Sequence, residues 1–245
     1  MAVDRDAQCR HGVASSGLIA ILVPSSRRRR PGDVGSARVP RGTGQEDPMT
    51  PLIDEGFTIR TGQRVRLRPV KAGDAPALAE MIDGLSPLAR RRRFHGAVTG
   101  LSAARLHDMT HLDGHRQIGL VAAVEHDGAL RLVADARCVT DASDSAAEFA
   151  LVVAEGWRGR GIARRCLAAL RRAAAEEGLH WLYGHVQADN LPMLALLRRC
   201  GFALSAHRGD AGLVVAEARC VRPTAPLPPT RLPQPARAAA SLGRA

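Results

Sequence analysis

Residues 158–163 read Arg-Gly-Arg-Gly-Ile-Ala, and this glycine-rich stretch separates a predicted strand from a predicted helix. Residues 148–153 before it are mostly apolar, and apolar side chains recur at helical spacing from Ile162 until Gly178. Because glycine has no Cβ, the backbone can turn tightly here and aim several N–H groups at one spot, at the positive end of the helix. The stretch therefore predicts an anion site that suits a diphosphate.

Other phosphate-binding loops fit this stretch less well. No Lys-Ser or Lys-Thr pair follows it, as a Walker loop requires. It also lacks the third position and the downstream acidic residue of a Rossmann fingerprint. A strand-to-helix turn without any ligand has a similar composition, so the stretch alone leaves that alternative open.

The pattern around the loop predicts an α/β domain with a mixed sheet. Apolar alternation predicts strands over 64–70, 117–125, 129–139, 148–153, 181–187 and 212–220. Helical spacing and capping residues predict helices that begin at Asp74, Ser86, Ser102, Ile162 and Asn190. His126-Asp127-Gly128 is a hairpin turn signal, and Trp181 and Tyr183 are expected in the core because one side of their strand must be buried.

The 245 residues divide into one expected domain, 57–220, and two tails. Residues 1–56 are rich in Gly, Pro, Ser and Arg without a sustained period, and both they and 221–245 are expected to be disordered. The second tail holds six of the fifteen prolines and no acidic residue. Met49 precedes the first periodic segment, and translation starting there is our hypothesis.

Charge and composition narrow the possible partners. The formal net charge is +11, and residues 57–220 carry 23 basic and 17 acidic side chains with no dominant basic block. Such a surface suits an anionic small molecule or an acidic partner. Only seven residues are aromatic, which disfavours a base-stacking nucleic-acid platform, although a protein that binds nucleic acid through its basic tails is the third alternative.

The cysteines indicate a reduced environment. The five cysteines form no short pair, so neither a disulfide framework nor a zinc site is predicted, as is typical of a cytoplasmic protein. The apolar run 12–23 is too short for a membrane span, and no membrane partner is expected.

Arg158, Gly161 and Ala163 match the pattern of Arg or Gln, two residues, Gly, one residue, then Gly or Ala. Together with the strand before them, Asn190 and the ending Gly201-Phe202, they make the chain resemble the GNAT family of acetyl-CoA-dependent N-acetyltransferases over 57–220. The resemblance implies one α/β domain whose mixed, largely antiparallel central sheet is flanked by helices.

Three further stretches resemble the acetyltransferase domain of bacterial Pat-type protein lysine acetyltransferases. They are Gly-Leu-Ser-Pro at 84–87, Arg-Arg-Phe at 92–94 and Met-Leu at 193–194. This nearer resemblance favours a protein lysine as acceptor, with a protein N-terminus or a small amine as alternatives.

The family resemblance implies acetyl-CoA as co-substrate and no metal. The strands around Val153 and Val186 would splay apart to receive the pantetheine arm. The implied cofactor-binding residues are the main-chain groups of Leu151, Val152 and Val153 for the pantetheine amides, then Arg158, Gly159, Arg160, Gly161, Ile162 and Ala163 for the diphosphate, and Asn190 for the pantetheine region.

Glu148 is the candidate catalytic base, since a glutamate occupies this place before Phe-Ala in the Pat-like pattern. An amine acceptor is mostly protonated at neutral pH, so its attack on a thioester needs a group that takes a proton. His185 on the next strand is the alternative base, and an acid on a solvated strand end is the structural alternative for Glu148.

One position departs from the family. Many GNAT enzymes carry a tyrosine seven places after the asparagine, to protonate the leaving thiolate, and that place holds Leu197 here. Coenzyme A would then leave as the thiolate, or Cys200 or a water would serve. A degenerate domain that binds CoA as a regulatory module is the second functional hypothesis.

The remaining polar clusters carry weaker predictions. His107, His111 and His115 are spaced by four, but Asp113-Gly114 is expected to end their helix and no further metal ligand is evident. The run 90–93 is expected to be a solvated arginine face rather than a docking patch for an acidic substrate. Loops 83–100 and 207–212 are expected to select the acceptor, and the sequence leaves oligomeric state and acyl length open.

Overall fold

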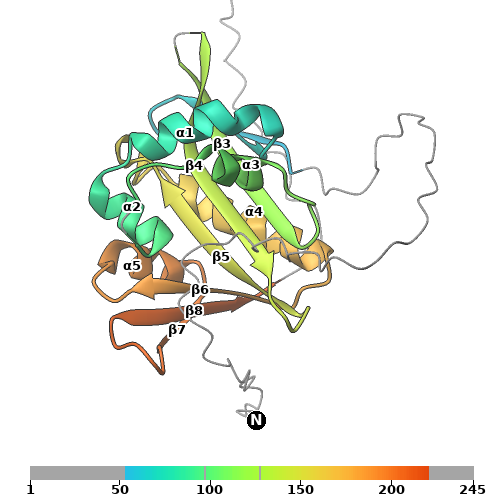
Figure 1. The fold of residues 1–245 in the computed structure, drawn as a ribbon, viewed down its shortest axis with the longest axis vertical. Helices are drawn as coiled ribbons and strands as arrows, with labels where there is room; N and C mark the ends of the chain where they lie inside the picture. Colours follow the sequence, from blue (N-terminus) through green and yellow to red (C-terminus); the bar gives the residue numbers. More distant parts are fainter. Residues whose placement is uncertain (1–52, 97, 127, 221–245) are drawn as a thin grey trace, which may run out of the picture.

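The computed structural model describes residues 53–220 except 97 and 127, which form an eight-stranded sheet with helices on both faces (Figure 1). The strands are β1 (Glu55–Thr58), β2 (Arg64–Pro69), β3 (Gln117–His126), β4 (Ala129–Thr140), β5 (Ala146–Val153), β6 (Trp181–Gln187), β7 (Ala203–Ala206) and β8 (Leu213–Arg219). The predictions for residues 1–52, including a start at Met49, and for 221–245 fall outside the described residues.

The strands lie in the order β1-β2-β3-β4-β5-β6-β8-β7. Each neighbouring pair is antiparallel except β5 and β6, which run parallel. A parallel pair needs a crossover connection, and helix α4 (Ile162–Glu176) provides it. The predicted mixed, largely antiparallel sheet is thus confirmed.

Helices cover the two faces unequally. On one face lie α1 (Ala75–Asp83), α2 (Pro87–Phe94) and α3 (Ala103–Thr110), and α4 lies on the other (Figure 1). Helix α5 (Leu191–Arg199) follows β6, and short 3-10 turns cover Ala72–Asp74 and Glu155–Trp157. No helix among the described residues has the length and apolar character needed to cross a membrane.

Serine side chains begin two of these helices. The hydroxyl of Ser86 accepts from the N–H of Ala89 at 3.2 Å, and that of Ser102 accepts from the N–H of Arg105 at 3.3 Å. Pro87 occupies the first turn of α2, where its missing N–H costs no hydrogen bond. Both predicted caps are therefore present.

The sheet separates two apolar clusters because successive side chains of a strand point to opposite faces. On the α4 face, Leu167 and Leu170 pack with Phe149 and Leu182. On the other face, Leu78, Ile82 and Met109 pack with Val121 and Val152. Phe149 and Val152 of β5 thus belong to different clusters, and this packing fixes which face of the sheet each side chain of β5 occupies.

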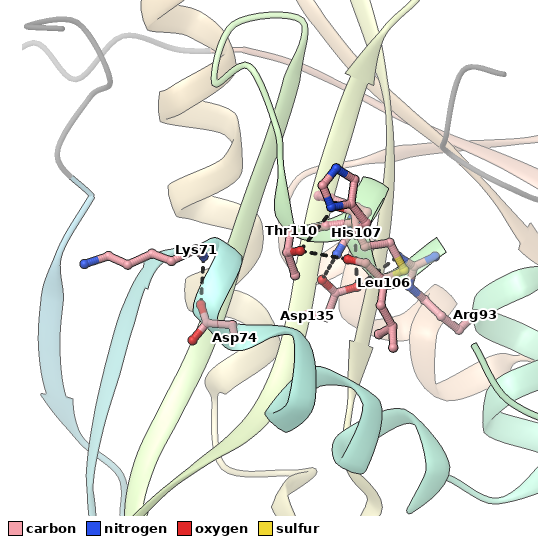
Figure 2. A network of polar contacts seen from close by, with 9 residues as sticks. Lys71, Asp74, Arg93, Leu106, His107, Thr110 and Asp135 are labelled. Atoms are coloured by element: carbon pink, nitrogen blue, oxygen red, sulfur yellow. Dashed lines mark hydrogen bonds and ion pairs between the residues drawn. The ribbon is translucent and has the colours of Figure 1, made fainter. Parts of the chain in front are cut away.

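A buried ionic group joins α2 to the sheet (Figure 2). Asp135 on β4 is fully buried and accepts from Arg93 of α2 at 2.9 Å and from Arg137 of β4 at 2.5 Å. Burial by itself would raise the pKa of Asp135, but the two guanidinium groups outweigh it and the pKa is lowered. The aspartate is therefore a buried anion that holds two cations.

A second ion pair fixes the entry to α1. Arg68 of β2 donates to both oxygens of Asp74 at 2.7 Å. The N–H of Lys71 donates to the same carboxylate at 2.8 Å, as Figure 2 shows. Burial would raise the pKa of Asp74, but these donors lower it. The buried carboxylate of Asp74 is thus fully paired, and it ties the end of β2 to the start of α1.

Four features differ from the sequence analysis. The sheet begins at Glu55, two residues before the predicted domain start, because Ile53 and Phe57 join the core. Strand β7 was absent from the prediction, since its four residues carry little alternation. The expectation that Trp181 and Tyr183 are core was wrong, because the alternate residues of β6 are the buried ones. Arg93 is buried against Asp135 and is no part of a solvated face.

Replacing Asp135 by Asn tests the buried ionic group. The variant leaves two buried guanidinium groups uncompensated, so we expect the free energy of unfolding to fall by about 3–5 kcal/mol in urea denaturation. The control is Asp144→Asn, whose partner Arg116 and own side chain are 60% and 66% exposed and which should change stability by less than about 1 kcal/mol. Equal effects of the two variants would contradict this account.

Candidate functional site

The parallel strands β5 and β6 stay together for only three residue pairs. Ala146, Ala147 and Glu148 pair with Trp181, Leu182 and Tyr183, and no pairing follows although both strands continue. On its other side, β5 stays paired with β4 as far as Val153. The two strands therefore diverge beyond Glu148 and leave one edge of β5 without a strand partner.

Phe149 lies at the point of divergence. A Cβ built on Gly184 of β6 would come within 2.8 Å of the Phe149 ring, so only glycine admits the ring there. Phe149 is buried and also meets Phe202, with ring centroids 5.3 Å apart. The aromatic ring thus occupies the space that a side chain of β6 would otherwise need.

The free edge of β5 presents alternate main-chain groups. The N–H of Ala154 donates to Val133 across the β4 pairing, so by alternation Leu151 and Val153 turn their N–H and C=O groups toward the gap, whereas Val152 turns its own toward β4. The side chain of Arg158 donates to the Val153 carbonyl at 3.0 Å. Of the three residues whose main-chain groups were expected at the site, Leu151 and Val153 therefore present them at the free edge. Val152 does not, and its side chain packs under α1–α3.

The glycine-rich loop follows directly and opens α4. Gly159 and Gly161 have φ of 71° and 82°, in the left-handed region that favours glycine. A Cβ at either position would meet no atom within 4 Å, so the space over the loop is open. The first N–H groups of a helix have no intrahelical acceptor, and those of the 15-residue helix α4 begin here. The loop has the open backbone and positive end that a diphosphate requires.

The side chains of the loop divide between inside and outside. Ile162 is buried and anchors the first turn of α4, with Ala163 packed partly against the same core. Arg158 is half-exposed, and the Arg160 guanidinium lies 4.9 Å from the Trp157 ring. The arginines are thus held at the rim of the loop and the apolar residues fasten it to the core.

The segment from α1 to α2 connects both sides of the gap. Ser86, which caps α2, donates its hydroxyl to Glu155 at 2.7 Å, just before the glycine-rich loop. Near the other end of α2, Arg92 approaches Asp189, which follows β6, at 3.5 Å. Helix α2 therefore bridges the end of β5 and the end of β6.

Asn190 stands where α5 begins. Its carbonyl accepts from Met193 and Leu194, but its side chain makes no capping hydrogen bond. The carboxamide is half-buried, and its polar atoms are left for another partner. This placement is consistent with the predicted binding role, which stays a prediction.

Glu148 lies where the strands separate, on the face covered by α2. Its Oε1 is 2.9 Å from Nδ1 of His185 on β6, and each side chain is 24% exposed. Tyr183 shares this face, and burial together with the negative charge of Glu148 raises its pKa. The two residues that the sequence offered as alternative bases are therefore one hydrogen-bonded pair.

Two histidines beside this pair were missed by the sequence analysis. His95 ends α2 with φ of 51°, and its half-buried side chain lies near His185. Burial, with His185 next in effect, lowers the pKa of His95. The ring of His207, in the loop after β7, lies 5.3 Å from that of His185. Both lie in the loops predicted to select the acceptor, but no spacing in the sequence joins them.

The positions considered for a general acid lie apart from Glu148. Leu197 is fully buried in the cluster on the α4 face and has no proton to give. Cys200 packs against the same cluster, and burial raises the pKa of its thiol. Glu148 lies on the other face of the sheet, the one covered by α2, so the structure does not bring Cys200 close to it.

The other polar clusters make contacts within the protein instead of forming a site. His107 and His111 stack with centroids 3.7 Å apart, whereas His115 pairs with Glu177 at 2.9 Å. Within 53–220, leaving aside 97 and 127, no group of three or more His, Cys, Asp or Glu could hold a metal ion. In the arginine run of α2, Arg90 donates to the Thr99 carbonyl at 2.9 Å and Arg91 is exposed.

Comparison with known proteins agrees with this geometry. The model of the acetyltransferase (GNAT) family matches residues 89–202. An acetyltransferase of Pseudomonas aeruginosa is 28% identical over 158 residues, which are 64% of this chain and 85% of that protein. The GNAT domain of S. lividans PAT is similar in structure, with TM-score 0.64 and 25% identity over 71% of this chain and 99% of that one.

A more distant structure has a similar fold. It is the spermidine N-acetyltransferase from Vibrio cholerae in complex with CoA and spermine, with TM-score 0.51 and 20% identity. The similarity covers 64% of this chain and 95% of that chain.

Gly184→Ala tests the close approach of Phe149 to β6. The added methyl group forces the ring or the strand to shift, and we expect the free energy of unfolding to fall by about 1–3 kcal/mol in chemical denaturation. Gly73→Ala is the control, since a Cβ there meets nothing within 4 Å. Phe149→Leu should lessen the effect of Gly184→Ala in the double variant, and strictly additive effects would contradict the proposed clash.

Proposed function

This chain carries an acetyltransferase domain of the GNAT family, and we propose that it moves the acetyl group of acetyl-CoA to a primary amine. The observation that carries the proposal is the opening between β5 and β6. It has Glu148 at its closed end, a free strand edge along one side, and the glycine-rich loop at its outer end. A strand edge, an anion site and a carboxylate in this order match the three parts of the reactants: an amide-bearing arm, a diphosphate and an amine.

The chain's own groups bind and orient the co-substrate. Leu151 and Val153 offer main-chain groups to the amides of the pantetheine arm, as a neighbouring strand would do. The N–H groups of the loop and of the first turn of α4, with Arg158 and Arg160, hold the diphosphate. Asn190 contributes its free carboxamide on the β6 side. This positioning supplies much of the catalysis, because the two reactants then meet in one orientation.

Glu148 takes the proton of the attacking amine. The amine nitrogen bonds to the carbonyl carbon of the thioester, the carbon–sulfur bond breaks, and coenzyme A leaves as the thiolate. The acceptor enters as an ammonium group, so Glu148, directly or through a water, first takes one proton to give the free amine. The nitrogen loses a second proton to solvent as the amide forms, and the thiolate takes a proton from solvent. Neither a covalent enzyme intermediate nor the missing tyrosine is needed for this balance.

A protein lysine is the acceptor class that we favour. Its ammonium group is attracted by the Glu148 carboxylate, while the wider domain is basic, with 23 basic and 17 acidic side chains over 57–220. A polycation such as spermine meets repulsion from that surface, whereas a lysine flanked by acidic residues does not. The exposed Arg91 of α2 lies on the segment that bridges the opening. The Pat-type resemblance points the same way.

The first test measures binding of acetyl-CoA by calorimetry to the full chain and to a double variant, Arg158→Ala with Gly161→Glu. We expect affinity to fall about 100-fold or more, because one charge-assisted contact of roughly 1.5 kcal/mol is lost and a carboxylate is added beside the diphosphate. The matched control is Arg131→Ala with Gly128→Glu on the β3–β4 hairpin, where the arginine is 55% exposed and the glycine has φ of 75° and open space. No binding by the folded wild-type chain would overturn the proposal.

The second test replaces Glu148 by Gln and follows acetyl transfer to lysine peptides with acidic or neutral flanks, and to spermine. Loss of the base should lower kcat by about 100-fold or more with acetyl-CoA affinity unchanged. Glu125→Gln, an exposed strand glutamate, should leave kcat unaltered. Unchanged turnover in Glu148→Gln would remove Glu148 from the mechanism, and a preference for spermine would reject the lysine acceptor.

The second candidate function is a regulatory module that binds CoA without transferring an acetyl group. The buried Leu197 in place of the expected acid is the observation that favours it. Tight binding of acetyl-CoA with no turnover on any amine of a broad panel would support this function over the enzyme.

A further inference from the structure

We propose that His185 is a positioning residue that holds the Glu148 carboxylate in one orientation toward the opening between β5 and β6. The proposal rests on the proposed function, in which Glu148 is the base. In this proposal His185 orients the base, whereas its place on β6 first suggested that it could be the base itself.

The hydrogen bond between the two side chains fixes the state of the imidazole. A carboxylate can only accept, so the 2.9 Å contact between Nδ1 of His185 and Oε1 of Glu148 places the hydrogen on Nδ1. Any form of the ring that carries a hydrogen on Nδ1 satisfies the contact. His185 thus donates one directed hydrogen bond to Glu148.

The donor ring is itself held from several elements. The Tyr183 ring lies edge-on with centroids 6.0 Å apart on the same strand, and His207 lies edge-on at 5.3 Å after β7. The Nδ1 of His207 accepts from the Gly209 N–H at 3.2 Å, which fixes that ring as well. On the α2 side, the half-buried His95 lies near His185. A ring packed in this way presents Nδ1 in a single direction.

The orientation leaves one oxygen of Glu148 for the reaction. Oε1 is occupied by His185, whereas Oε2 takes no hydrogen bond from any residue within the described part of the chain. His95 stays neutral near pH 7, because burial and its neighbour His185 lower its pKa, so it does not compete as a cation for that oxygen. The carboxylate therefore keeps one fixed oxygen and one available oxygen.

The proposal predicts a split between the kinetic constants. Without the donor, the carboxylate turns among several orientations and fewer of its contacts with the amine are productive, so kcat falls. Acetyl-CoA affinity, which depends on the strand edge and the glycine-rich loop, stays unchanged. A general loss of packing at the opening would change both.

The experiment compares His185→Phe, which keeps a ring but has no donor, with His185→Asn, whose amide nitrogen stands close to the position of Nδ1. We expect kcat of the Phe variant to fall about 10-fold, the effect typical of removing an orienting partner, with acetyl-CoA affinity unchanged. The Asn variant should keep a rate within about threefold of wild type. The control is His180→Phe, at an exposed histidine just before β6, which should leave kcat unaltered.

Three results would overturn the proposal. A Phe variant with wild-type kcat would show that the hydrogen bond is without consequence. A Phe variant less active than Glu148→Gln would make His185 the base. If neither substitution folds, the tautomer of His185 in the wild-type chain, read from nitrogen-15 NMR of the ring, decides: hydrogen on Nε2 alone contradicts the donor role. Normal turnover in Glu148→Gln would instead refute the proposed function, and the NMR result would still stand.

Discussion

The short parallel contact between β5 and β6 is the constraint on which the rest of the site depends. Three residue pairs hold the two halves of the sheet together, and the strands then separate at Phe149, whose ring lies against Gly184. The separation exposes main-chain groups that a continuous sheet would have satisfied internally. A ligand that carries amides can satisfy them, which makes the opening a binding site by the same hydrogen bonding that builds the sheet.

Helix α2 keeps this opening in shape. It reaches one side through Ser86 and Glu155, the other through Arg92 and Asp189, and the sheet beneath through Arg93 and Asp135. The first two contacts are exposed and contribute little free energy, whereas breaking the buried one is costly. Among these polar contacts, the buried aspartate with its two arginine partners therefore contributes most to holding α2 on the sheet.

Positive and negative side chains lie at different parts of the opening. Arginines stand at the glycine-rich loop and along α2, where an anionic co-substrate and acidic groups of an acceptor are attracted. At the closed end of the opening the charged residue is Glu148, accompanied by histidine and tyrosine side chains that need carry no charge. This arrangement fits the acceptor that we propose, a single ammonium group flanked by acidic groups, better than a polycation.

The sequence by itself determined the α/β class, most of the strands, the two serine caps and the loop that opens α4, because these depend on local spacing and on the conformational freedom of Gly159 and Gly161. It could not show that Glu148 and His185 touch, or that His95 and His207 join them, since those residues come from four separate segments. Nor could it place Arg93 in the interior or Tyr183 toward the site. Local patterns record which residues alternate, whereas the register of the sheet and the packing of α2 decide which face each one meets.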